Sequence, residues 1–103
     1  VEMLETAYKN NPDDPYITDS IGWGYYLIGR YEEAERLMRK AIILMPNDPI
    51  VNDHYGDILW SLNQKLQARY YWRSILNLNE ADDSMRDRVK YKLIRGPKIE
   101  KTL

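Results

Sequence analysis

The chain matches itself at a spacing of 34 residues, and this internal repeat strongly limits the folds open to it. The recurring residues are a turn proline, a pair typical of helix starts, small residues and a few charged or apolar ones. They are Pro12 and Pro46, Asp14-Pro15 and Asp48-Pro49, Asp19 and Asp53, Gly22 and Gly56, Ala34 and Ala68, Arg39 and Arg73, and Leu44 and Leu78. A fixed period of this length is typical of arrays whose single units are too small to bury their own apolar faces. The sequence therefore predicts a stack of similar units.

Helix signals fall at the same places in each period. In Asp14-Pro15 and Asp48-Pro49, the aspartate can cap a helix and proline fits the first helical position. Apolar residues then recur at helical spacing, and no strand-like alternation occurs. The expected helices are 1–11, 16–28, 31–44, 49–62, 65–78 and 83–94. The predicted fold is all-α, built from antiparallel helical hairpins.

This register divides the chain into five parts. We expect residues 1–12 to be the second helix of an incomplete repeat, 15–48 and 49–82 to be two complete units, 83–95 to be a capping helix and 96–103 to be a tail. The capping helix should cover the apolar edge of the last unit, because no further repeat buries that edge. Its covering residues would be Met85, Val89 and Leu93, which lie over Trp72, Ile75 and Leu76.

Charge and composition disfavour several classes of protein. The net charge is −1, so no global field attracts nucleic acid. No apolar run approaches the ~20 residues that cross a bilayer. The absence of cysteine removes disulfides and thiolate metal sites but leaves the compartment undetermined. Because the chain begins with Val1, we expect it to be part of a longer parent.

Small residues stand where two helices of one hairpin must approach closely: Gly22 with Ala34, and Gly56 with Ala68. Together with the period, the tight turns and the closing Pro46, they make residues 1–94 resemble the tetratricopeptide repeat. The stretch from Asn52 to Trp60 resembles a form of this repeat recurrent in bacterial proteins. Thr18 and Asn52 depart from the pattern, because the family often has a large aromatic residue at these places.

The resemblance implies a right-handed superhelix, an alpha-solenoid, whose concave face is lined by the first helix of each hairpin. Family members typically bind peptides or partner helices there. Aspartates stack along this face, flanked by aromatic side chains that could hold a partner's Lys or Arg. The expected groove consists of Tyr16, Asp19, Trp23, Tyr26, Asp53, Asp57, Trp60, Asp87 and Tyr91. Alternatively, the aspartates serve solubility or local hydrogen bonds between neighbouring helices.

Other candidates for chemistry are weaker. His54 lacks the nucleophile, metal-ligand pair or phosphate loop that would make it a catalytic base, so we expect a partly exposed histidine. The aromatic run Tyr70-Tyr71-Trp72 lacks the basic groove of a base-stacking platform. We therefore expect no enzyme activity, no catalytic, cofactor or metal site, and no nucleic-acid partner.

The favoured function is a protein–protein interaction module, or scaffold. It would bind a peptide or helical segment, basic or amphipathic, on the concave face. The alternative is a structural end-piece or spacer of a longer array, with no ligand of its own. The incomplete first unit also offers a route to end-to-end self-association.

Overall fold

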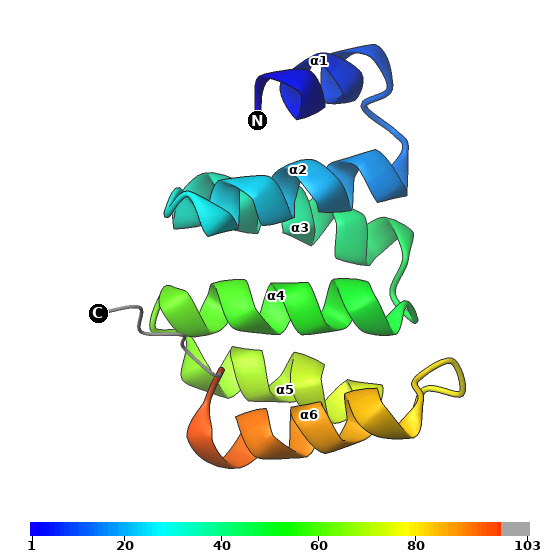
Figure 1. Cartoon of the computed structure of the whole chain (residues 1–103), viewed down its shortest axis with the longest axis vertical. Coiled ribbons are helices and arrows are strands. Elements are labelled where there is room, and N and C mark those ends of the chain that lie inside the picture. The colour runs from blue at the N-terminus through cyan, green and yellow to red at the C-terminus, as the bar shows by residue number, and fades with distance from the viewer. Residues whose placement is uncertain (98–103) are drawn as a thin grey trace.

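A computed structural model describes residues 1–97 and shows only helices and turns in that range. The six helices are α1 (Glu2–Asn10), α2 (Pro15–Leu27), α3 (Tyr31–Leu44), α4 (Pro49–Ser61), α5 (Lys65–Ile75) and α6 (Asp83–Arg95). They stack in chain order from one end of the molecule to the other (Figure 1). Helices α2 and α3 form one hairpin and α4 and α5 form the next. The predicted all-α stack of hairpins is confirmed.

Aspartate side chains cap the N-terminal ends of three helices, α2, α4 and α6. Asp14 accepts bonds from the backbone N–H groups of Tyr16 and Ile17, at 2.9 and 3.2 Å. Asp48 does the same for Ile50 and Val51 one period later, at 2.9 and 3.1 Å. These bonds satisfy donors that have no partner inside a helix. The two units therefore start in the same way and project equivalent side chains in the same direction.

The turns inside the two hairpins are also equivalent. Gly29 has φ +84° and Asn63, which lies 34 residues later, has φ +63°. Glycine and asparagine are the residues that most readily take this left-handed conformation at the end of a helix. The backbone N–H of the next residue then bonds back across the turn, Arg30 to Tyr25 O and Gln64 to Leu59 O, each at 2.9 Å.

Close helix contacts bury Gly22 and Gly56, as the repeat register predicts. Gly22 lies against Met38 and Ala34 of α3, whereas Gly56 lies against the indole of Trp72 in α5. Trp72 is fully buried and belongs to a core that runs through both hairpins. Small residues on the first helix thus make room for large ones on the second.

Polar residues fill the two positions where the family often has an aromatic one. Thr18 and Asn52 are buried. Thr18 donates to Asp14 O at 2.8 Å, and Asn52 donates to Pro46 O and Asp48 O at 3.0 and 2.8 Å. These side chains tie the start of each first helix to its own cap or preceding turn, so the departure from the pattern is locally satisfied.

Two expected boundaries differ from the structure. Helix α5 ends at Ile75 rather than Leu78, because the backbone N–H groups of Leu76, Asn77 and Leu78 bond to the residue three positions earlier. That pattern tightens the helix into a turn. The second difference lies at the C-terminal end of α6. Gly96, the first residue of the expected tail, is buried against Trp60 and has φ +77°. The rest of the expected tail, residues 98–103, lies outside the described residues.

Helix α6 packs mainly on α5, and its inner side joins the core. Val89 is fully buried, and Met85 and Leu93 pack against the same cluster as Trp72 and Ile75. These are the residues expected to cover the apolar edge of the last unit. The division of the chain into repeat units and a cap stays a prediction. The structural end-piece function depends on this division.

Candidate functional site

The candidate site lies on the face formed by α2, α4 and α6, which we call the first-helix face. On α2, the expected residues Tyr16, Asp19, Trp23 and Tyr26 follow one another at helical spacing. On α4, Asp53, Asp57 and Trp60 do the same. The third helix, α6, contributes Asp87 and Tyr91. Contacts across the two junctions between these helices decide which side chains remain accessible.

At the junction of α2 and α4, His54 joins the expected residues of α2. Its Nδ1 lies 2.9 Å from a carboxylate oxygen of Asp19. Its ring stacks on Trp23 with centroids 4.0 Å apart and planes at 16°. Trp23 in turn stacks on Tyr26 with centroids 4.5 Å apart, and Tyr26 contacts Tyr31 at 5.5 Å. The result is an aromatic column of Tyr31, Tyr26, Trp23 and His54.

The aromatic column is partly open. Trp23, Tyr26 and His54 are half-buried, and Tyr31 is 38% exposed. Burial raises the pKa of the Tyr26 phenol, so its hydroxyl stays protonated and can donate a hydrogen bond at neutral pH. The column can offer ring edges and one phenol group to a partner.

At the junction of α4 and α6, Lys92 occupies the place where an open acidic strip was expected. Its Nζ lies 2.7 Å from Asp53 and 2.9 Å from Asp57. All three side chains are buried, with 8 to 10% of each exposed. Arg88 approaches the other oxygen of Asp53 at 3.9 Å. The expectation that Asp53 and Asp57 present free charge on an open face is therefore wrong, because both are buried and paired with a lysine of the same chain.

Burial shifts the pKa of one of these carboxylates, Asp57. Burial raises the pKa of Asp57 to about 6, against the attraction of Lys92, and repulsion from Asp53 adds to the rise. Burial opposes the charge on Lys92, but the two carboxylates outweigh it and hold its pKa above the usual value. Lys92 therefore remains a cation, while Asp57 is the carboxylate that protonates most readily.

The remaining expected residues divide into two groups. Trp60 turns toward α5, where its ring lies 5.5 Å from that of Trp72 and Gly96 covers its edge. In contrast, Tyr16 is 69% exposed, Tyr91 is 43% exposed, and Asp87 is exposed. The structure thus brings Asp19, Trp23 and Tyr26 together and joins Asp53 to Asp57 through Lys92. Tyr16 lies on the same helix as Trp23 and Tyr26, whereas Asp87 and Tyr91 lie on α6.

The contacts of Lys92 and His54 on this face were not predicted from the sequence. Lys92 stands one period after Ile58, which is fully buried. A lysine in the register of a core residue is a signal that an opposite charge lies nearby, and the aspartates of α4 are such charges. His54 carried a weaker signal, because only the stacking of α2 on α4 brings it to Asp19 and Trp23.

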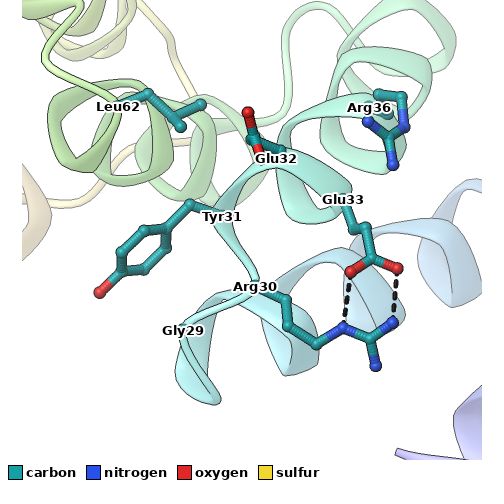
Figure 2. Close-up of a pocket in the computed structure, with 7 residues that line it drawn as sticks. All are labelled: Gly29, Arg30, Tyr31, Glu32, Glu33, Arg36 and Leu62. Atoms are coloured by element: carbon teal, nitrogen blue, oxygen red, sulfur yellow. Dashed lines mark hydrogen bonds and ion pairs between the residues drawn. The ribbon is translucent and has the colours of Figure 1, made fainter.

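A hollow of about 510 Å³ lies beside the Tyr31 end of the aromatic column. It is lined by the turn between α2 and α3, the first residues of α3 and Leu62. Figure 2 shows Arg30 bound to Glu33 through two parallel bonds, each 2.6 Å long. Tyr31 lies on the other side of this turn and Arg36 points away from the pair. Arg30 and Glu33 thus satisfy each other's charge and are not directed at a ligand in this hollow.

Two properties of the described residues concern metal ions and membranes. Within residues 1–97, no group of three or more histidine, cysteine, aspartate or glutamate side chains could hold a metal ion. No helix in the same range is long and apolar enough to span a bilayer.

Comparisons with known proteins agree with the repeat. A tetratricopeptide repeat family model matches residues 19–48. A TPR repeat-containing protein of Pseudomonas aeruginosa is 45% identical over 56 residues, which cover 54% of this chain and 9% of that protein. Aspartyl/asparaginyl beta-hydroxylase of Homo sapiens is 34% identical over 68 residues, or 66% of this chain and 9% of that enzyme. The mouse enzyme is 30% identical over 61 residues, or 59% of this chain and 8% of that enzyme.

The chain therefore spans less than a tenth of the length of these relatives. Tetratricopeptide repeats generally mediate protein–protein interactions and are generally not catalytic. The bacterial form expected from the sequence fits the Pseudomonas relative. The 34-residue period, the stacked helical hairpins of residues 1–97 and these matches support an assignment of the chain to the tetratricopeptide-repeat family.

Proposed function

We propose that this chain is a protein-interaction module that binds an amphipathic peptide or helix of a partner on the α2 and α4 part of the first-helix face. The observation that carries the proposal is the half-open aromatic column of Tyr31, Tyr26, Trp23 and His54, with the exposed Tyr16 on the same helix as Trp23. Aromatic side chains supply much of the binding energy at protein interfaces. The proposal includes no catalytic step and no nucleic-acid ligand.

The charges of this face argue for an amphipathic partner rather than a strongly basic one. Lys92 pairs with the buried Asp53 and Asp57, and His54 lies against Asp19. Asp87 is then the exposed carboxylate among the expected groove residues. Affinity should thus depend more on apolar contacts than on salt.

The test selects peptides from a random library with the intact chain and measures their affinity for variants. Tyr16→Ala removes an exposed tyrosine of the proposed site. Tyr70→Ala is a matched control, because Tyr70 is 62% exposed but lies on α5. We expect the first variant to weaken binding by about tenfold and the control by less than twofold. Loss of binding in the control alone would place the site on the second helices.

A second candidate function is a structural end-piece, and a specific residue favours it. Lys90 of α6 stands one period after Gly56 and two after Gly22, where a following helix would have to approach closely. A long charged side chain there opposes such packing. In this alternative α6 ends the array and the face has no ligand.

The end-piece proposal is tested by appending residues 65–78 after Pro97 through a flexible linker. With Lys90 present, the added segment should show no hydrogen-exchange protection. With Lys90→Gly, protection should appear, because glycine leaves room for the added segment to pack closely on α6. Protection of the added segment in both proteins would contradict a terminating role for α6.

A further inference from the structure

The charges of the chain are divided between its two ends. Residues 1–64 carry eleven of the sixteen acidic side chains but only five of the fifteen basic ones. From Lys65 onward, the sequence has ten basic side chains and five acidic ones. The small overall charge of −1 therefore hides an acidic end and a basic end. The basic end includes α5 and α6, at the opposite end of the stack from α1 (Figure 1).

Two of these cations gather over one indole ring. Lys65 Nζ lies 4.8 Å and the Arg69 guanidinium carbon 5.1 Å from the centroid of Trp60. Arg69 also donates from Nε to Leu93 O at 3.3 Å, which links the start of α5 to the end of α6. We call Trp60, Lys65 and Arg69 the Trp60 cluster. The ring and the Leu93 bond hold the guanidinium in one place before any ligand arrives.

The cluster has cationic donors to spare. Within residues 1–97, neither Lys65 nor Arg69 forms a salt bridge with a carboxylate. The Nε atom of Arg69 is occupied, but the two terminal nitrogens have no acceptor among the same residues. Lys65 is exposed and Arg69 half-buried, so an anion can reach both. The terminal nitrogens of a guanidinium can bind the two oxygens of one carboxylate together.

We propose that the Trp60 cluster binds an acidic segment of a partner protein. A carboxylate would lie on the terminal nitrogens of Arg69, a second acidic side chain would pair with Lys65, and Trp60 would support both cations. This surface joins the end of α4, the start of α5 and the end of α6, and it shares no residue with the aromatic column of the proposed function. The acidic end of the chain repels a long polyanion, which favours a short acidic protein segment over a nucleic acid.

The probe for this surface is fluorescein-labelled hexaglutamate, followed by anisotropy at low salt. Lys65→Gln with Arg69→Gln removes both cations of the cluster. Lys9→Gln with Arg36→Gln is the control, because it changes the net charge equally through exposed side chains of α1 and α3. Circular dichroism and thermal melts confirm that each protein is folded. The single variant Arg69→Lys keeps the charge but loses the paired nitrogens.

We expect the cluster variant to weaken hexaglutamate binding by at least about tenfold and the control by less than about twofold. Arg69→Lys should fall between them, and added salt should weaken binding to the intact chain. Equal losses in the two double variants would overturn the proposal, because the attraction would then come from net charge alone. Absence of hexaglutamate binding to the intact chain would also overturn it. Tighter binding of an oligouridine of the same length would replace it with a nucleic-acid surface.

Discussion

Gly22 and Gly56 occupy the same register in successive units, but the structure predicts different tolerance to a side chain. A Cβ atom at Gly56 would lie 2.2 Å from Trp72 Nε1, on a rigid and fully buried ring. At Gly22 it would lie 3.1 Å from Met38 Cε, the end of a flexible chain. The same substitution should therefore have different costs in the two hairpins.

Gly56→Ala should lower the free energy of unfolding by about 1–3 kcal/mol, through overpacking against Trp72. Gly22→Ala should be close to neutral, because alanine gains ~1 kcal/mol in helix propensity and Met38 can shift. Urea unfolding followed by circular dichroism measures both values. Equal losses would show that the two contacts are equally rigid.

Asp57 should make stability depend on pH in an uncommon direction. Its pKa in the folded chain is about 6, above the ordinary aspartate value of 3.8, because the side chain is buried. The folded state therefore binds more protons than the unfolded state between about pH 4 and 6, so this residue's contribution to stability falls as pH rises through that window. The expected fall is roughly 2–3 kcal/mol.

The change Asp57→Asn isolates this contribution, since Glu33 and Glu35 have lowered pKa values and act in the opposite direction. The difference in unfolding free energy between Asp57→Asn and the parent should shift by roughly 2–3 kcal/mol in favour of the variant from pH 4 to pH 7. A constant difference across this range would mean that Asp57 ionises normally in the fold.

At the scale of elements, α6 is joined to α4 through charge as well as to α5 through apolar packing. Val89 provides the buried apolar contact and Lys92 the ion pairs with Asp53 and Asp57. Removing the lysine would leave Asp57 without a cation and Asp53 with only the more distant Arg88. The helix should then lose much of its hold on the stack.

Lys92→Met should cost about 3–5 kcal/mol at pH 7, the usual loss when one partner of a buried ion pair is removed. Lys90→Met serves as control on the same helix, because Lys90 is exposed, and should change stability by less than about 0.5 kcal/mol. Thermal melts of the two variants give the comparison. Similar melting temperatures would mean that α6 is held by apolar contacts alone.

At the scale of the whole molecule, each helix contacts chiefly its neighbours in the chain. Stability in such a stack is close to a sum of local units and their interfaces. Helix α1 has no buried residue and packs mainly on α2, with Met3 88% exposed. The N-terminal end should therefore be the least stable part of residues 1–97.

Amide hydrogen exchange should show α1 opening at least about tenfold more readily than α4, whose helix has nine buried residues. Sedimentation at rising protein concentration tests the proposed end-to-end self-association at the same edge. If α1 gains protection as the protein associates, the exposed face of α1 forms the contact. Protection of α1 equal to that of α4 in the monomer would contradict the expected gradient.

Local signals in the sequence were enough for the repeat, the helix starts and the small residues at helix contacts. Asp14 and Asp48 cap their helices because capping depends on groups within one turn of the chain. The helix contacts of Gly22 and Gly56 could be predicted, because residues that are 34 positions apart occupy equivalent places in successive hairpins. These features depend on residues close in sequence or related by the repeat.

The charge state of the candidate site was decided by tertiary structure. Lys92 meets Asp53 and Asp57 from 39 and 35 residues away, and His54 meets Asp19 from 35 residues away. Charge pairing depends on distances of a few ångströms and on exclusion of water, and neither is encoded in local spacing. A row of aspartates in the sequence thus became a set of internal ion pairs. The spacing of Lys65 and Arg69 already places them together on α5, but only the packing of α6 brought Leu93 to Arg69.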